Sequence, residues 1–145
     1  MARGRPDPER LAVWRALLAT HARITTQLSA ELEAERELSL SWYEVLLVLS
    51  EAGGRLRMSE LAERLIVNRS SLTRQCDRMV DAGLIKREPV AGDARGIQAA
   101  LTRLGRETFR RAAPAHLRGV HRHFTQYLTD SDVAALARVF AKLPD

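Results

Sequence analysis

The segment RSSLTRQCDRMVDA, at residues 69–82, concentrates side chains that can hydrogen-bond to bases and phosphates. On a helix, with about 100° between successive residues, its apolar residues would share one side: Leu72, Cys76, Met79 and Val80. Its polar residues would occupy or flank the opposite side: Ser70, Ser71, Thr73, Arg74, Asp77, Arg78 and Asp81. Arginine donates paired hydrogen bonds to guanine, and serine and threonine bond bases or phosphates. The pattern is typical of a helix that reads the DNA major groove.

An ordinary surface helix is the alternative interpretation of this segment. Its arginines and aspartates would then form ion pairs along the helix, such as Arg74 with Asp77. A hairpin with a basic tip follows directly, which favours the interpretation as a reading helix.

The sequence GDARG, at residues 92–96, is the tip of that hairpin. The two glycines permit a tight turn, but a turn does not require Asp93 and Arg95. An arginine at such a tip can enter the minor groove, where the potential is most negative. We expect Asp93 to accept a hydrogen bond from the Arg95 guanidinium and hold it in place. A simple Asp-Gly type of turn with a solvated arginine is the alternative.

Basic charge is concentrated in the middle of the chain. Residues 55–111 contain thirteen Arg and Lys against seven Asp and Glu, whereas the two ends together contain ten against eleven. The whole net charge of +5 therefore originates in the segment that includes the reading helix and the hairpin. This distribution indicates a polyanion-binding module. A merely solvated charged face is the alternative.

Length and composition indicate one globular domain, or one with an appendage. The chain has 145 residues, of which 46% are hydrophobic and 28% charged. A single cysteine excludes an internal disulfide and a four-thiolate zinc site. No apolar run approaches the roughly 20 residues of a membrane span, and the N-terminus lacks the apolar core of a signal peptide. We expect a cytoplasmic protein without a membrane partner.

The first predicted helix is unusually long. Asp7-Pro8-Glu9 combines an N-cap, a proline in the first turn and an acidic residue, and the helix should continue to about Glu35. Its length of roughly 40 Å exceeds what a small compact lobe can cover. Part of its apolar side therefore needs another surface.

Eight further elements are predicted downstream. Ser41 to Glu44 forms a capping box for a helix that stops at Gly53-Gly54, and an extended piece follows. Ser59 is the expected cap of a short helix, Ile66-Val67 the turn after it, and Asn68 the cap of the reading helix. Two strands are expected over residues 84–88 and 97–102. Thr102 should cap a helix with apolar positions up to Leu128 and a kink or break at Pro114, and Thr129 with Asp132 should mark the start of the last helix. A short helix, a turn, a second helix and a hairpin make a winged helix-turn-helix.

With these residues in place, the chain resembles the MarR family of bacterial transcription regulators. The similarity lies in MSELAERL, NRSSLTRQCDRMVDAGLIKRE, GDARGIQAALT and the following LGRE, and is strong over about residues 38–106. It departs at Ile66, where many relatives carry glycine; a β-branched residue is unsuited to positive φ, so this turn should differ slightly.

The resemblance implies a mainly α fold with a small β-hairpin wing and a homodimeric assembly. A winged helix-turn-helix DNA-binding lobe would comprise residues 38–102, and a helical dimerisation region residues 1–37 and 103–145. Two lobes would bind a pseudo-palindromic operator in double-stranded DNA. By resemblance, the major-groove readers are Ser70, Ser71, Thr73 and Arg74, the phosphate or base contacts are Arg69 and Arg78, and the wing pair is Asp93 and Arg95.

Members of the family often release DNA when a small aromatic molecule binds between the dimer helices and the lobe. Aromatic area and polar tips on the first two helices suggest four ligand-binding residues: Trp14, His21, Trp42 and Tyr43. Packing in the core or the dimer is the alternative role for them. Other relatives respond to oxidation of a cysteine near the first helix, but Cys76 lies on the apolar side of the reading helix and is expected to be a buried hydrophobe.

Metal and enzyme chemistry receive little support. The spacings of five and two between His116, His121 and His123 do not align ligands on a helix face, so no metal is expected. No nucleophile elbow, phosphate-binding glycine loop or zinc motif is present, so neither an enzyme nor a cofactor is expected. Together with the sequence patterns, the resemblance implies a homodimeric, sequence-specific DNA-binding regulator, a repressor relieved by a small aromatic effector. A regulator that acts by operator occupancy alone is the alternative.

Overall fold

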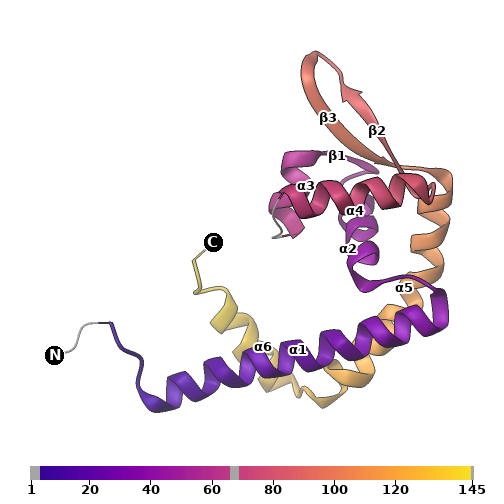
Figure 1. Cartoon of the computed structure of the whole chain (residues 1–145). Helices are drawn as coiled ribbons and strands as arrows, with labels where there is room; N and C mark the ends of the chain where they lie inside the picture. The colour runs from indigo at the N-terminus through magenta and orange to yellow at the C-terminus, as the bar shows by residue number, and fades with distance from the viewer. Residues whose placement is uncertain (1–3, 66–68, 145) are drawn as a thin grey trace.

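The computed structural model describes residues 4–65 and 69–144, apart from the side chain of Arg69. Within them, the chain forms six α-helices and a small three-stranded sheet at one end of the molecule, which confirms the mainly helical fold with a hairpin wing (Figure 1). The elements are α1 (Pro8–Arg36), α2 (Leu40–Glu51), β1 (Arg55–Arg57), α3 (Met58–Leu65), α4 (Arg69–Asp81), β2 (Ile85–Val90), β3 (Asp93–Leu101), α5 (Arg103–His123), the 3-10 turn η1 (Thr125–Tyr127) and α6 (Asp130–Phe140). The turn at Ile66-Val67 and the cap at Asn68 lie outside the described residues.

Helix α1 has the predicted start and length. The Asp7 carboxylate accepts a hydrogen bond from the Arg10 backbone N–H at 2.9 Å, and Pro8 is the first helical residue. The helix continues for 29 residues. Only Leu28 and Leu32 are buried along it, so most of its apolar side chains find no cover in this chain.

The predicted capping box at the start of α2 is wrong. The cap is Ser39, whose side chain accepts a hydrogen bond from the Trp42 backbone N–H at 3.3 Å, so Ser41 is the second residue of the helix. When the helix starts at Leu40, Val45, Leu46 and Leu49 lie buried in the core. Ser39 and Ser41 can cap a helix equally well, so this packing decides between them. Ser59 is likewise inside α3, because β1 leads into that helix without a loop.

The hairpin is tighter than the sequence suggests. The antiparallel order is β1-β3-β2, and Leu56 lies opposite Ala99. GDARG is not a loop: the turn is Ala91-Gly92, with Gly92 at φ 78°, and Asp93 already belongs to β3. A Cβ on Gly96 would lie 2.8 Å from the Asp93 carboxylate, so this glycine makes room for a side chain rather than for a turn.

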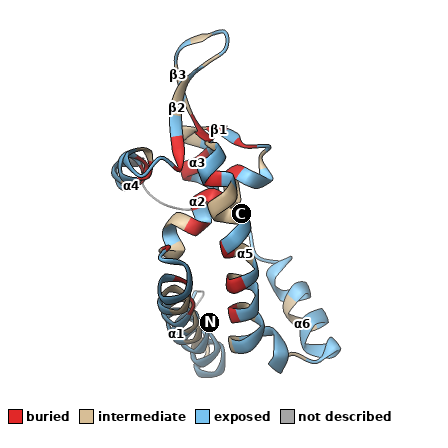
Figure 2. Cartoon of the chain, turned by 90° about the vertical axis from the view of Figure 1, so that its right-hand side faces the viewer, coloured by how far each residue is buried: buried red, intermediate tan, exposed pale blue. Residues whose placement is uncertain are grey.

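The buried core lies in the lobe formed by α2, α3, α4 and the sheet (Figure 2). The apolar side predicted for α4 is confirmed, because Leu72, Cys76 and Met79 are at most 1% exposed. Burial also raises the pKa of the Cys76 thiol. Cys76 therefore packs as a small hydrophobe with little thiolate at neutral pH.

Helix α5 connects the lobe to the remaining helices. The Thr102 side chain accepts a hydrogen bond from the Gly105 backbone N–H at 3.0 Å, as predicted for its cap. The helix continues through Pro114 without a break and ends at His123, before the apolar positions predicted at Tyr127 and Leu128. Helix α6 begins at the predicted position, and there Thr129 and Asp132 cap each other reciprocally.

Helices α1, α5 and α6 project away from the lobe as a loosely covered arm (Figures 1 and 2). Helices α1 and α5 pack against each other, whereas α6 contains no buried residue. Over the described part of the chain, none of the helices is both long enough and apolar enough to span a bilayer.

Candidate nucleic-acid interface

Helix α4 presents its polar side to solvent at the edge of the lobe, where Figure 2 shows it end-on. The predicted reading residues with described side chains are all exposed: Ser70, Ser71, Thr73, Arg74 and Arg78. The Arg69 side chain lies outside the described part of the structure. Exposed hydroxyl and guanidinium groups along one helix are what direct base readout requires.

An ordinary surface helix would pair Asp77 with Arg74, but this ion pair is not formed. The Asp77 carboxylate instead accepts a hydrogen bond from the Arg87 guanidinium of β2 at 2.5 Å. The same guanidinium donates to the backbone carbonyl of Thr73 at 3.1 Å. On the other side of α4, the Gln75 amide donates to the Ser41 carbonyl at 2.9 Å. Helix α4 is thus tied to the wing on one flank and to α2 on the other.

The wing aspartate has a different partner from the one predicted. The Asp93 carboxylate accepts one hydrogen bond from the Arg57 guanidinium of β1 at 2.7 Å and another from the backbone N–H of Arg95 at 3.1 Å. The expected bond from the Arg95 guanidinium is not formed, because that side chain extends into solvent. The bond from Arg57, followed by the Arg95 backbone N–H, holds the pKa of Asp93 below its usual value.

A groove of about 430 Å³ separates the start of α3 and the flank of α4 from the wing. Its lining includes three guanidinium groups and one carboxylate: Arg57, Arg87, Arg95 and Asp93. Two of these arginines already hold carboxylates of this chain, and Arg95 remains directed outward. The groove therefore combines a fixed basic floor with one extended cation at the wing.

Sequence reasoning missed Arg57 and Arg87. Arg57 reaches Asp93 across 36 positions in the chain, and Arg87 reaches Thr73 across 14. The first contact depends on the pairing of β1 with β3, which carries Asp93, and the second depends on the packing of α4 against β2. No local pattern in RLR or IKRE indicates such partners.

The four residues predicted to bind a ligand do not gather in one place. Tyr43 is buried at 2% exposure and stacks on Phe109 and His116, with centroid distances of 5.5 and 4.5 Å. Trp42 packs partly buried against the core, and Trp14 is exposed near the N-terminal end of α1. Of the four, only His21 lines the cleft that α1 and α2 form, which favours the packing alternative for Tyr43 and Trp42.

That cleft, of about 930 Å³, opens between α1 and the start of α2. Hydroxyl groups and two carboxylates dominate its described lining: Thr25, Thr26, Ser29, Ser39, Ser41, Glu33 and Glu44. No arginine or lysine is among these described lining residues. Partial burial raises the pKa of Glu44, against a weaker opposite effect of His21. The cleft suits a hydrogen-bonding or cationic molecule better than an anion.

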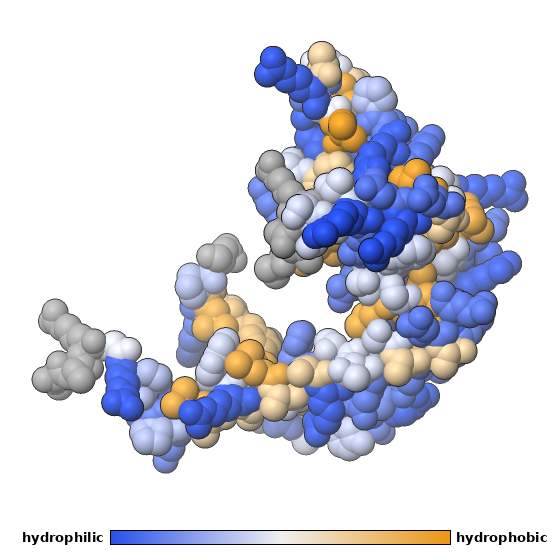
Figure 3. Space-filling view, in the orientation of Figure 1, coloured by the Kyte–Doolittle hydropathy of each residue, from blue (hydrophilic) through white to orange (hydrophobic). Residues whose placement is uncertain are grey.

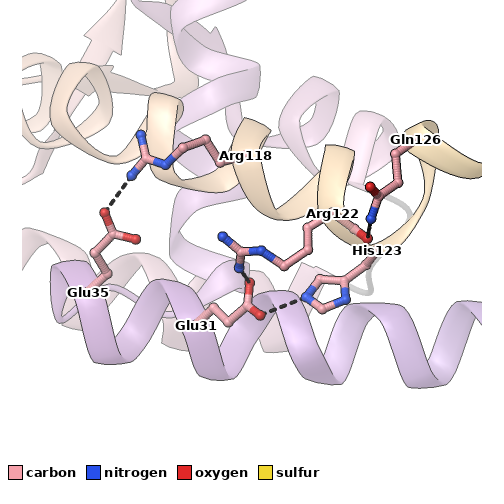
Figure 4. A network of polar contacts seen from close by, with 6 residues as sticks. All are labelled: Glu31, Glu35, Arg118, Arg122, His123 and Gln126. Atoms are coloured by element: carbon pink, nitrogen blue, oxygen red, sulfur yellow. Dashed lines mark hydrogen bonds and ion pairs between the residues drawn. The ribbon is translucent and has the colours of Figure 1, made fainter.

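A polar network joins α1 to α5 below the lobe (Figure 4). Glu31 contacts His123 at 2.7 Å and Arg122 at 3.0 Å, and Glu35 accepts from Arg118 at 2.6 Å. The hydrogen bond to His123 is the main cause that lowers the pKa of Glu31. Helices α1 and α5 approach closely at Gly119, where an added Cβ would lie 2.8 Å from the Leu28 side chain.

The three histidines of α5 have separate surroundings. His123 belongs to this network, and His121 contacts the Thr125 hydroxyl at 3.0 Å. His116 packs on Tyr43, and burial lowers its pKa. Within the described residues, no group of three or more His, Cys, Asp or Glu is arranged to hold a metal.

A short helix, a reading helix with an exposed polar side and an adjoining basic hairpin define a winged helix-turn-helix protein. A sequence model of the MarR family matches residues 36–96. AbsC, a MarR family transcriptional regulator from Streptomyces coelicolor, is 37% identical with a TM-score of 0.86, over 93% of this chain and 91% of AbsC. The chain therefore belongs to the MarR family of transcriptional regulators.

Two further relatives show the same similarity. Sco3205, a MarR family regulator from Streptomyces coelicolor solved in complex with DNA, is 30% identical with a TM-score of 0.87, over 94% of this chain and 90% of that protein. The HTH-type transcriptional regulator PecS of Dickeya dadantii (strain 3937) is 26% identical over 106 residues. That match covers 70% of this chain and 64% of PecS.

Proposed function

We propose that the protein is a homodimeric, sequence-specific repressor that binds a pseudo-palindromic operator in double-stranded DNA in the cytoplasm. The observation that carries this proposal is the single face on which the exposed polar side of α4 and the outward Arg95 flank a basic groove. That face offers the base-reading and phosphate-binding groups of a DNA-binding lobe.

Dimerisation is supported by apolar side chains that the chain leaves uncovered on its helical arm. They are Val13, Trp14, Leu17, Leu18, Leu117, Phe124, Tyr127, Val133, Val139, Phe140 and Leu143. In Figure 3, apolar side chains gather over α6 and the adjoining part of α1. Many exposed apolar side chains on one part of a protein are typical of an association site. We assign dimerisation to residues 1–37 and 103–145 and DNA binding to residues 38–102.

Within each lobe, we assign base reading to the start of α4 and minor-groove contact to the wing. Ser70, Ser71, Thr73 and Arg74 would face base edges, and Arg69 and Arg78 would contact phosphates or bases. Arg95 would enter the minor groove from a strand that Asp93 and Arg57 hold in place. The Asp93 carboxylate thus holds the wing strand in place and does not orient the Arg95 side chain.

Effector control belongs to the proposal as well, with the cleft between α1 and α2 as its site. The two carboxylates and the hydroxyl groups of this cleft favour a neutral or cationic effector, aromatic or not, over an aromatic acid. Regulation by operator occupancy alone is the second candidate, because three of the four predicted ligand residues do not line the cleft.

A gel-shift titration on the DNA upstream of the protein's own gene tests these functions. Tryptamine and indole-3-acetate carry the same ring with opposite charges, so they probe the cleft as a matched pair. Release of DNA by tryptamine alone supports an acid-lined effector site. Release by neither compound favours operator occupancy, and a protein that binds no duplex at low salt removes the whole proposal.

Two substitutions separate base reading from phosphate binding. Arg74→Ala should weaken operator binding by about 1–3 kcal/mol and relax base choice, because one base contact is lost. Arg95→Ala should lower the slope of log affinity against log salt by about one phosphate contact. Fluorescence anisotropy on operator and random duplexes at several salt concentrations measures both. Equal losses on the two duplexes would reduce Arg74 to a phosphate contact.

A further inference from the structure

Helix α4 carries two exposed carboxylates on a side that faces a polyanion in the proposed complex. Asp77 and Asp81 lie one turn apart, and each would repel phosphates. Their surroundings differ, because Asp77 is engaged by Arg87, whereas Asp81 forms no ion pair with the other described residues. The contrast calls for a role of Asp77 within the protein that outweighs its repulsion of DNA.

The ties on α4 lie on its two opposite flanks. Thr73 and Asp77 occupy one flank, and Gln75 lies roughly 160° away from each of them around the helix axis. The apolar side with Leu72 and Met79 packs on the core between the two flanks. Arg87 pulls on the first flank and the Ser41 carbonyl on the second, so the two ties oppose rotation of α4 in both directions.

Small rotations matter for a helix that reads bases. A rotation of about 20° moves an atom at the helix surface by about 2 Å, given a helix diameter of about 11 Å. A displacement of that size breaks a hydrogen bond to a base edge, because donor and acceptor must lie within about 3.2 Å. Close packing of the buried side of α4 already limits such a rotation, and directional hydrogen bonds on its polar flanks limit it further.

We propose that Arg87 and Gln75 are positioning residues that fix the rotation of α4 about its own axis, with Asp77, Thr73 and Ser41 as their anchors. The inference rests on the proposed DNA-binding function. On this proposal Arg87 does not contact phosphate, because its guanidinium is held by the Asp77 carboxylate and the Thr73 carbonyl. Operator affinity then depends on residues that do not touch DNA.

The pair Asp77→Ala and Asp81→Ala tests the proposal through the sign of the effect. Both variants remove one negative charge from the same helix, and simple electrostatics predicts tighter DNA binding for both. Positioning predicts that Asp77→Ala weakens operator binding about tenfold, the equivalent of one lost base contact. Asp81→Ala should bind as well as the parent protein or better. Tighter operator binding by Asp77→Ala overturns the proposal.

Gln75→Met tests the opposite flank without a change in charge. Methionine keeps the length of the side chain and removes the donor to Ser41. Operator affinity should fall several-fold, by the equivalent of about one hydrogen bond, while affinity for random DNA and the salt slope stay unchanged. Gln98→Met is the matched control, because the Gln98 amide donates to Glu88 within the sheet and not to α4.

Arg87→Met distinguishes positioning from phosphate contact. Positioning predicts weaker operator binding with an unchanged salt slope, whereas loss of a phosphate contact lowers the slope by about 0.9. Circular dichroism and thermal unfolding confirm that each variant is folded at the temperature of the binding assay. An unchanged ratio of operator to random affinity in Arg87→Met and Gln75→Met refutes the inference. If the parent protein itself binds no DNA, the proposed function fails instead.

Discussion

The lobe and the helical arm use the same kinds of residue to different ends. In the lobe, apolar side chains from α2, α3, α4 and the sheet bury one another almost completely. In the arm, α6 has no buried residue, and Trp14 and Leu117 are 54% and 62% exposed. The lobe therefore buries its own apolar side chains, whereas the arm leaves exposed those that the second copy in the proposed dimer would cover.

The polar contacts of the two regions also differ in what they join. In the lobe, Arg57 and Arg87 hold carboxylates on the two elements that face DNA in the proposed complex. In the arm, Arg118 and Arg122 hold carboxylates of α1 against α5. All four pairs are partly exposed, and such pairs contribute only about 0–1 kcal/mol each to stability. Their main contribution is to set positions.

The largest expected effect comes from charging the uncovered surface of the arm. Leu117→Glu should give a monomer and weaken operator binding on the order of 100-fold, because two linked lobes bind a two-part site far more tightly than one. Light scattering after size exclusion and gel shift measure the two quantities. Ile97→Glu, on β3 and 53% exposed, lies outside the residues assigned to dimerisation, so it is the matched control for oligomeric state and should remain dimeric. A dimeric Leu117→Glu protein would contradict the assignment of the arm.

A pair of glycines on α5 sharpens the comparison at the level of packing. An added Cβ on Gly105 would lie 2.0 Å from the Leu84 carbonyl oxygen, which also accepts hydrogen bonds from Thr102. Gly105→Ala should lower the free energy of unfolding by about 3 kcal/mol, because backbone must move in a close-packed lobe.

Gly119→Ala is the counterpart in the arm. Its Cβ would meet only the ends of the Leu28 and Glu31 side chains, at 2.8 and 3.3 Å. These ends can rotate away, so the expected loss is about 1 kcal/mol or less. Chemical denaturation at one fixed protein concentration measures both variants. Equal losses would show that the arm is packed as rigidly as the lobe.

Local signals in the sequence predicted most of the fold. The caps at Asp7, Thr102 and Thr129 were identified correctly, because each depends on contacts within one helical turn. The cap of α2 was not, because Ser39 and Ser41 have the same chemistry and the choice depends on which residues reach the core. Apolar periodicity predicted the buried side of α4 for the same local reason.

The candidate site was predictable only in its outline. The exposed side of α4 and the outward Arg95 follow from periodicity and from the hairpin. The partners of Asp93 and Asp77 do not, because strand pairing brings Arg57 to Asp93 from a distant position and the packing of α4 on β2 brings Arg87 to Asp77. The chemistry of the cleft between α1 and α2 could not be predicted either, because Glu33 and Glu44 line the same cleft only when α1 packs on α2.

The smallest expected effect concerns the contacts that hold α1 against α5 in acid. The hydrogen bond to His123, with help from Arg122, lowers the pKa of Glu31 below its ordinary value of 4.5. The associated stabilisation is fully present above pH 4.5 and is lost as pH falls through the lower pKa of the folded state. Because the Glu31 side chain is 38% exposed and solvent screens it, Glu31→Gln should lower the free energy of unfolding at pH 7 by less than about 1 kcal/mol.

The pH dependence of that small difference is more informative than its size. The gap between Glu31→Gln and the parent protein should close as pH falls from 4.5 toward 3, because both then carry a neutral side chain at this position. Urea denaturation across this range measures it. Glu63→Gln, an exposed carboxylate of α3 without an ion pair to other described residues, should show no such closing gap. A gap that stays constant with pH would mean that Glu31 acts by packing, and the arm would then resemble the lobe more closely than its exposed surface indicates.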